Sequence, residues 1–473
     1  MRLKRMIEHA GRGTGEFSGI PPLPFGKLCM VFCACLVVAI SHQANAQRIA
    51  SYTGEIGTDV FSEAGNWSEQ LVPGPADTAL FALSGQYAVS FKENAEVAKL
   101  RMIEAGHDIE PQKVTLELDG KTLTLLAPFG ETSAEGPLVL TPSSQAPRIL
   151  IFEGGTLRFE GFWQATFTGP FPAVLIFDKG MKIEGPGMGY TGAYGSGETY
   201  LIGGSKWVSE GRSWAGVLGH AGDAHGLFVI SGPGSSFQAT TQEGTPPLDE
   251  RIFYVSTSGT GMLRILDGAT FECDVVNQGN GVMGEEAFST VVVDGENSRF
   301  QADRLNVGGG SNNNANPAQP AGNALFCVSN GAVANVGALK VFAREASENL
   351  TQASGRVLID GGKLNLGSDH PAPSAEFMPG SSLEFRLRKP TGEAPLSSEA
   401  ELKIEGSTLV ITLDPAFRPP VGTKIPLVSC QTVTGNFAGL PDASQIEVNG
   451  TTFTVSYNMD GANLIGLTVA ATK

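Results

Sequence analysis

The chain has 473 residues, with 48 acidic against 32 basic side chains and a formal charge of −16 at pH 7. This acidic balance excludes the extended basic surface that binding to nucleic acid or to an anionic membrane requires. Glycine is abundant at 61 residues and charged residues make up only 17%, which is below the usual quarter and favours a chain rich in strands and turns.

The first 46 residues have the layout of a secretory signal peptide. Five basic residues precede an apolar run over residues 28–40, and Ala44-Asn45-Ala46 supplies the small-x-small pattern of a cleavage site before Gln47. This run is short for a membrane span, so a retained anchor is the second interpretation. We therefore expect cleavage after Ala46, a secreted or outer-surface protein, and no transmembrane segment in the mature chain.

The mature chain would be more acidic than the whole. The leader removes five of the 32 basic and two of the 48 acidic residues, which leaves 27 against 46 and a charge of −19. That charge favours solubility and makes divalent cations possible partners. Three cysteines remain, Cys273, Cys327 and Cys430. An odd and widely spaced set is no disulfide framework, so buried thiols are expected, with one bridge between two of them left open.

No stretch after residue 46 shows sustained helical spacing. Short apolar or alternating runs bounded by Gly, Asn, Asp or Pro follow one another instead, for example at residues 114–118, 122–126, 148–152 and 173–177. Asp119-Gly120, between the first two runs, supplies the positive φ that a tight corner demands. The sequence therefore predicts an all-β chain, whose first mature section covers residues 47–130.

The second section, residues 131–370, carries a phrase that recurs five times: a short β-branched run, one or two polar residues, and a glycine. The copies end at Gly232, Gly268, Gly295, Gly331 and Gly361, at intervals of 36, 27, 36 and 30 residues. Such self-similarity is typical of a β-solenoid, in which each copy forms a coil that cannot bury its apolar face alone. The uneven spacing predicts one or two turns per copy, with loops of variable length.

Two sections complete the chain. Residues 371–400 are rich in Pro, Ser and Glu and are interpreted as a connection, and residues 401–473 are interpreted as a small C-terminal β section. Its last apolar run, residues 464–469, is expected to cap the open end of the solenoid, because an unpaired strand edge invites aggregation.

Three phrases of the mature chain carry a family resemblance. They are the opening Asn66-Trp67-Ser68 … Val72-Pro73-Gly74, the repeat Gly232-Pro233-Gly234-Ser235 with Phe237, and the closing Gly435-Asn436-Phe437 … Leu440-Pro441. They resemble secreted bacterial β-helix proteins with autotransporter-associated β-strand repeats, here without the C-terminal translocator of an autotransporter. The resemblance implies a right-handed parallel β-helix outside the cell that generally has no assigned catalytic activity.

One cluster has the residue types of a metal site. His220, Asp223 and His225 lie together in a six-residue stretch of a glycine-rich segment. A zinc site takes three or four convergent ligands, so plain loop histidines are the preferred interpretation and a metal centre is the alternative. No zinc-protease, serine-hydrolase or phosphate-loop motif occurs, so no cofactor is expected.

The repeat also places acidic residues at its corners. Asp267, Asp294 and Asp360 are expected at equivalent corners, where stacking would align them as a cation-binding or catalytic ladder. The simpler interpretation is that Asp favours this turn because its side chain bonds nearby backbone N–H groups. Ser231 and the pair Ser329-Asn330 at the same corner favour that simpler interpretation.

Aromatic residues gather between residues 163 and 214. If Trp163, Trp207 and Trp214 were exposed, they would form a strip on which sugar rings stack, although packing in a core or loop is the preferred interpretation. Two hypotheses follow. The favoured one is an exported, non-catalytic structural or adhesive β-solenoid that contacts glycan or a cell-surface component. The alternative is a polysaccharide lyase or glycosidase on the same fold, with its groove near residues 163–225.

Overall fold

The computed structural model describes residues 48–103, 111–126, 136–140, 146–159, 171–185, 189–193, 195–209, 214–241, 250–279, 287–309, 322–344, 353–367, 373–389, 392–461 and 463–472. These residues belong to one compact unit, Gln47–Lys473. The unit is built almost entirely of strands, most of which pair in parallel, and this confirms the all-β prediction. None of the helices in these ranges is long and apolar enough to cross a membrane.

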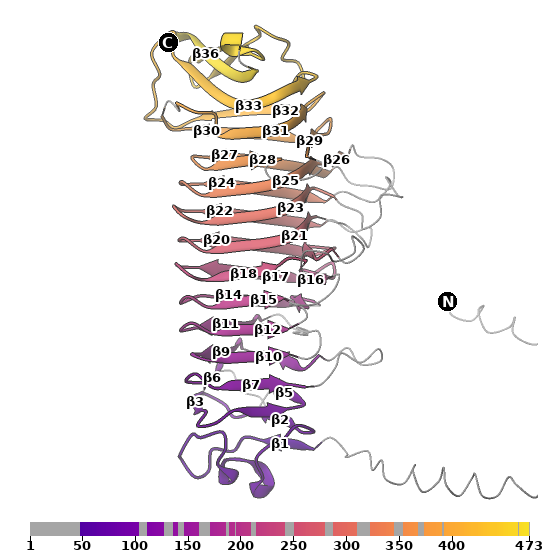
Figure 1. Ribbon diagram of the computed structural model, residues 1–473, viewed down its shortest axis with the longest axis vertical. Coiled ribbons are helices and arrows are strands. Elements are labelled where there is room, and N and C mark those ends of the chain that lie inside the picture. The colour runs from indigo at the N-terminus through magenta and orange to yellow at the C-terminus, as the bar shows by residue number, and fades with distance from the viewer. Residues whose placement is uncertain are drawn as a thin grey trace, which may run out of the picture. The chain divides into compact units, whose positions relative to one another are not determined.

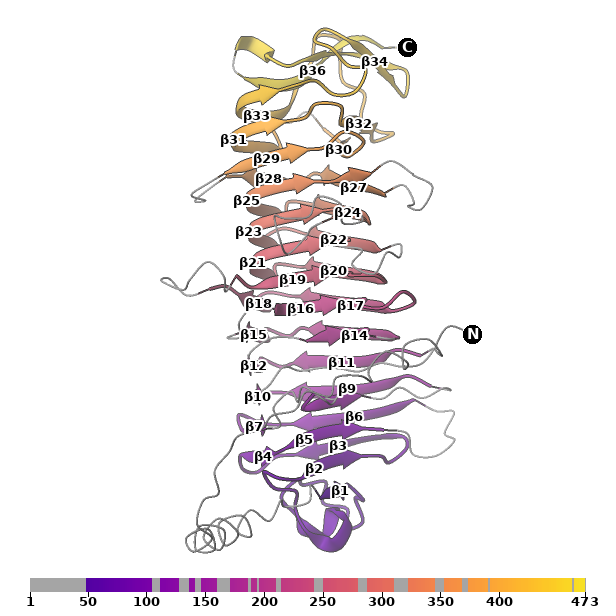
Figure 2. The same ribbon diagram turned by 90° about the vertical axis from the view of Figure 1, so that its right-hand side faces the viewer.

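One sheet, here called the long sheet, takes a strand from each successive pass of the chain (Figures 1 and 2). Its parallel order is β3 (Gln86–Ser90), β6 (Gln112–Glu117), β9 (Arg148–Glu153), β11 (Ala173–Asp178), β14 (Ser196–Leu201), β17 (His225–Ser231), β20 (Thr260–Leu266), β22 (Phe288–Asp294), β24 (Asn323–Ser329), β27 (Ala353–Asp360), β30 (Ser382–Leu387) and β32 (Thr408–Leu413).

A second sheet, the branched sheet, receives the chain directly after each of these strands. Its first row is β4 (Ala95–Val97), β7 (Thr122–Leu125), β10 (Thr156–Phe159), β12 (Lys182–Gly185), β15 (Lys206–Ser209) and β18 (Ser236–Ala239). Its second row is β13 (Tyr190–Thr191), β16 (Trp214–Leu218) and β19 (Ile252–Val255). Both rows continue into β21 (Thr270–Gln278), β23 (Arg299–Val307) and β25 (Val333–Val341), and then into β28 (Lys363–Leu366), β29 (Ser374–Phe377) and β31 (Leu396–Lys403).

The long strands join the two rows. The first half of β21 pairs with β18 and its second half with β19, so one continuous strand belongs to both rows. On the other side, the two halves of β25 pair with β28 and β29. Each pass of the chain therefore crosses three rows of strands, which enclose the apolar interior.

Different elements close the two ends. At the start, β1 (Ile49–Ser51), β2 (Thr78–Phe81), β5 (Lys99–Met102) and β8 (Leu138–Leu140) form a small parallel sheet beside two short 3-10 helices, η1 (Ala64–Asn66) and η2 (Ser68–Gln70). At the other end, β33 (Lys424–Thr434) pairs in parallel with β31 and antiparallel with β36 (Leu464–Thr472), followed by β35 (Thr451–Ser456) and β34 (Gln445–Val448). The remaining elements are β26 (Ala343–Arg344), which pairs antiparallel with β27, and η4 (Met459–Gly461).

The five copies of the repeated phrase lie on consecutive strands of the long sheet, β17, β20, β22, β24 and β27. Each copy therefore corresponds to one pass of the chain. Their inward residues align in the parallel register and are buried, namely Ile230, Ile265, Val293, Val328 and Ile359. Next to this file Phe237, Phe271 and Phe300 stack at centroid distances of 5.2 and 5.5 Å. Stacking identical positions on neighbouring strands thus builds the core.

The segment interpreted as a connection, residues 371–400, is part of the sheets instead. It contains β29, β30 and the start of β31, each paired in register with its neighbours. Phe377, Leu383 and Phe385 alternate with polar residues and point into the core, where each is at most 1% exposed. The Ser and Glu content that suggested a linker belongs to the outward positions of these strands.

Candidate functional site

Of the three tryptophans considered for an exposed strip, Trp207 has the core packing that was the preferred interpretation. Trp207 on β15 is 0% exposed and its ring packs edge-on against Phe177 and Phe237 at 5.6 and 6.0 Å. It is a core residue and has no face for a sugar, so the strip interpretation is corrected for this position. Trp163 lies outside the described residues, and the backbone of Trp214 begins β16.

The histidine cluster is split between different surroundings. His220 is half-buried: its Nδ1 lies 2.9 Å from the hydroxyl of Thr257, and its ring lies 4.8 Å from that of Tyr190. Burial lowers the pKa of His220, which favours the neutral imidazole. His225, at the start of β17, and Asp223 are exposed. Within the described residues, no three His, Cys, Asp or Glu side chains gather as a metal ion requires.

The corner aspartates are not equivalent. Leu266, rather than Asp267, aligns with Asp294, and Asp267 lies in the turn after β20 with a positive φ of 55°. Each carboxylate bonds a side chain of a neighbouring strand or turn: Asp267 accepts from Ser231 at 2.9 Å, Asp294 from Asn330 at 2.6 Å, and Asp360 from Arg388 at 2.6 Å. The corners therefore link successive passes of the chain.

Cys273, Cys327 and Cys430 carry free thiols. Cys273 and Cys430 are buried and Cys327 is half-buried, which agrees with the expectation of buried thiols. Burial raises the pKa of the Cys327 and Cys430 thiols, so the reactive thiolate is disfavoured at neutral pH.

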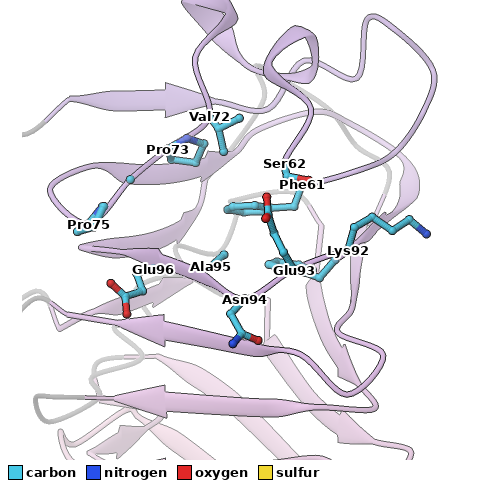
Figure 3. Close-up of a pocket in the computed structure, with 12 residues that line it drawn as sticks. Phe61, Ser62, Val72, Pro73, Pro75, Lys92, Glu93, Asn94, Ala95 and Glu96 are labelled. Atoms are coloured by element: carbon cyan, nitrogen blue, oxygen red, sulfur yellow. The ribbon is translucent and has the colours of Figure 1, made fainter.

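The structure does contain one pocket of ligand size, near the start of the stack (Figure 3). It encloses about 380 Å³ and is lined by residues 61–62, 72–75 and 91–96, which come from three separate segments. Its apolar floor is the pair Phe61 and Phe91, whose rings stack at 4.5 Å, and both are buried. Trp67 fixes this floor, because its indole N–H donates to the carbonyl of Phe61 at 2.7 Å.

One wall of the pocket is the Val72-Pro73-Gly74-Pro75 loop, which an ion pair holds in place. The Arg48 guanidinium donates to Asp77 through Nη2 at 2.6 Å and to the carbonyl of Val72 at 3.0 Å. Asp77 also accepts from the backbone N–H of Gly74 at 2.8 Å. The bonds from Arg48, chiefly, and from Gly74 outweigh desolvation and hold the pKa of Asp77 below its usual range.

The opposite wall is polar and acidic. Glu93, Asn94 and Glu96 are exposed at the rim, on and before β4, and Asn94 is fixed because its Oδ1 accepts from the backbone N–H of Thr122 at 2.9 Å. Figure 3 shows the Glu93 carboxylate rising beside Phe61, while Lys92 extends away from the other labelled side chains. An apolar floor beneath carboxylate and amide acceptors suits a ligand with one flat apolar face and several hydroxyl groups.

Comparisons of the chain with protein-family models, with curated proteins and with solved structures find no match. The sequence did not predict the pocket, although Val72-Pro73-Gly74, which carries part of the family resemblance, lines it. The one available signal was the turn-forming Pro-Gly-Pro segment between strands, which places a rigid loop on the surface.

Proposed function

We propose that this chain is an exported structural or adhesive protein of the bacterial surface or extracellular matrix, built as a right-handed parallel β-helix. The parallel register over successive passes and the three rows of strands support the helix. The right hand is the one that nearly all parallel crossovers adopt. The leader-like first 46 residues support export, and the family resemblance to autotransporter-associated repeat proteins belongs to the same proposal.

The observation that carries the structural role is the way charged side chains are used. Ion pairs join neighbouring strands along the stack: Arg158 with Glu184 at 2.8 Å, Arg356 with Glu384 at 2.7 Å, and Arg388 with Asp360 at 2.6 Å. Asn335, Asn365 and Ser397 form a further chain of side-chain hydrogen bonds at 2.9 and 2.8 Å across three strands. Side chains committed to such contacts hold one layer on the next and favour a scaffold over a reaction centre.

We propose a glycan as the ligand of the pocket at the start of the stack. A pyranose ring presents an apolar face that would rest on Val72 and Pro75, which line the pocket and remain accessible, and its hydroxyls would donate to Glu93 and Asn94. The two rim glutamates are also the observation that favours the alternative, a glycosidase, because such enzymes act through a pair of carboxylates.

A glycan array with residues 47–473 tests both versions when sugar breakdown is read out on every hit. We expect binding without breakdown, and weaker binding in Glu93→Gln. Glu117→Gln is the matched control, because Glu117 is an exposed carboxylate on β6 that does not line the pocket, and it should bind like the parent chain. Breakdown that is lost in Glu93→Gln or Glu96→Gln would establish the enzyme instead. Failure to bind any glycan would overturn the ligand assignment.

A further inference from the structure

The outward face of the long sheet is apolar along its middle. Because side chains alternate across a strand, the residues opposite the buried ones point away from the core. Between β9 and β24 two adjacent files of outward residues run up this face. The apolar members of the first file are Ile149, Val174, Leu227, Met262 and Leu325. Those of the second file are Ile151, Ile176, Val229, Val292 and Cys327.

Most of these side chains remain partly accessible, and Met262 is 37% exposed. Most outward positions on either side are polar, such as Ser196, His225 and Thr260 on one edge and Glu153, Asp178 and Asp294 on the other. Phe288 and Leu266 are the apolar residues in register with them. An apolar centre with a polar rim is the anatomy of a protein–protein interface, and exposed apolar areas of this extent mark such contacts.

Four residues interrupt the apolar files: Glu198 and Thr290 in the first file, and Tyr200 and Arg264 in the second. Glu198 and Tyr200 lie on β14, the strand on one side of β17, and Arg264 lies on β20, the strand on the other side. Glu198 accepts a hydrogen bond from the Tyr200 hydroxyl at 2.7 Å. Tyr200 and Arg264 thus lie in the same file, one strand to either side of β17, and Glu198 is hydrogen-bonded to Tyr200 from the neighbouring file.

Two exposed aromatic residues follow the same symmetry. Phe171, just before β11, is 36% exposed, and Phe288, at the start of β22, is 45% exposed. In the sheet order β11 lies two strands before β17 and β22 lies two strands after it. A two-fold axis along β17 would therefore bring the aromatic residue of each copy near that of the other, about one residue out of register.

The size of the face suits a dimer. Seven strands at about 4.8 Å spacing, with three outward positions on each of β9, β11 and β14 and four on each of the others, cover on the order of 500 Å² in projection. Side chains make the accessible surface larger than its projection, so the face approaches the ~800 Å² per partner of a standard stable interface.

We propose that the outward face of the long sheet, from β9 to β24, binds a second copy of this chain face to face, about a two-fold axis that runs along β17. Arg264 of each copy then lies opposite the Tyr200–Glu198 pair of the other, which forms the contact twice. The apolar residues of β9 and β11 lie against those of β24 and β22. This inference rests on register and exposure, and it does not depend on the proposed function.

Sedimentation equilibrium of the purified chain, at concentrations from nanomolar to about 100 μM, tests the proposal. We expect a dimer whose dissociation constant rises on the order of tenfold or more in Glu198→Arg and in Arg264→Glu, because each change opposes like charges at two places. The double variant, Glu198→Arg with Arg264→Glu, should recover the parental affinity. The matched control is the swap of Arg356 and Glu384, an ion pair within one copy on β27 and β30, which should leave dimerisation unchanged.

Two further measurements test the proposal even if a charge variant misfolds. Val292→Glu on the outward face should yield a monomer, while Val208→Glu, at a 40% exposed position of β15 on the branched sheet, should remain a dimer. In the parent chain, alkylation of Cys327 should slow as the protein concentration rises, because dimerisation covers it. A chain that is monomeric throughout, or a dimer indifferent to Glu198→Arg, Arg264→Glu and Val292→Glu, overturns the proposal.

Discussion

At the residue scale, Gln278 is a polar side chain in apolar, fully buried surroundings. It ends β21, is 0% exposed and lies in register with the buried Val255. Neither its amide oxygen nor its amide nitrogen has a hydrogen-bond partner among the described residues. Gln112 on β6 is nearly as buried at 5%, but its amide donates to the carbonyl of Leu83 at 2.8 Å. A buried amide without a hydrogen-bond partner lowers the free energy of unfolding, whereas a hydrogen-bonded one raises it.

We therefore expect opposite effects from the same substitution. Gln278→Met, which keeps the volume and removes the unpaired groups, should raise the free energy of unfolding by about 1–2 kcal/mol. Gln112→Met should lower it by about 1 kcal/mol, because the Leu83 carbonyl loses its donor. Urea denaturation of both variants measures this, and a destabilised Gln278→Met would show that its amide is paired.

The Asp77 carboxylate predicts a dependence on pH. Its folded-state pKa is depressed below the ordinary 3.8, chiefly by the bond from Arg48. The unfolded chain therefore takes up the proton first. The stability that this carboxylate contributes is present above pH 3.8 and is lost as the pH falls through the folded-state pKa.

Asp77→Asn should lower the free energy of unfolding by about 1 kcal/mol at pH 7, after allowance for partial exposure. The difference between variant and parent should shrink towards zero at pH 2. Denaturation at the two pH values measures it. Glycan binding at pH 7 should weaken as well, because the Val72-Pro73-Gly74-Pro75 wall loses its anchor. A pH-independent difference would mean that Asp77 acts through its shape alone.

At the element scale, the corners before the strands of the long sheet set strict limits on side-chain size. Gly226 begins the inward file of β17, and a Cβ placed there would lie 2.3 Å from the carbonyl oxygen of Thr191 and 2.5 Å from the backbone nitrogen of Gly219. Both are backbone atoms, one on β13 and the other directly after β16, so they cannot rotate away as a side chain could. The chain folds over this corner only because no side chain stands there.

Gly226→Ala should therefore lower the free energy of unfolding by about 2 kcal/mol or more, since backbone must shift to admit the methyl group. Gly392→Ala, at a position with open space around the Cβ, is the matched control and should change stability by less than about 0.5 kcal/mol. Thermal melts of both variants compare the two. Equal effects would show that backbone freedom, rather than the close approach, explains the cost.

Strand positions could be predicted well from the sequence at this scale. The runs at residues 148–152 and 173–177 correspond to β9 and β11, because alternating Leu, Ile and Phe bounded by Gly or Pro form strands in almost any fold. The prediction of a connection over residues 371–400 was wrong because Pro, Ser and Glu outnumber the few inward apolar residues of β29 and β30, which hides the strand pattern. Only their pairing with β25, β27 and β28 shows that they are strands.

At the scale of the whole unit, the C-terminal end decides whether the stack exposes an edge. β33 pairs in parallel with β31 on one side and antiparallel with β36 on the other, and β35 and β34 follow. This reversal of direction ends the parallel series, and the predicted strand at residues 464–469 is indeed part of it. An open β33 would offer unpaired backbone groups to other chains.

Removal of residues 435–473 should make the protein aggregate, because it leaves the second edge of β33 unpaired. Light scattering during incubation at 37 °C measures the effect, and fibril-sensitive dye binding identifies strand addition. Removal of residues 1–46, which lie outside the compact unit Gln47–Lys473, is the control and should leave the protein dispersed. A truncated chain that stays dispersed would mean that the C-terminal strands protect no edge.

The sequence by itself determined the β class, the inward and outward positions of most strands, and the glycine-rich corners, because these depend on neighbours within a few residues. The tertiary structure alone decided that Asp267 falls out of step with Asp294, that Trp207 belongs to the core, and that Phe61, Val72 and Phe91 share a pocket. It also aligned the outward apolar residues into one face. Parallel stacking joins residues about one pass apart, and the passes differ in length through their loops, so contacts between passes follow from the register rather than from sequence spacing.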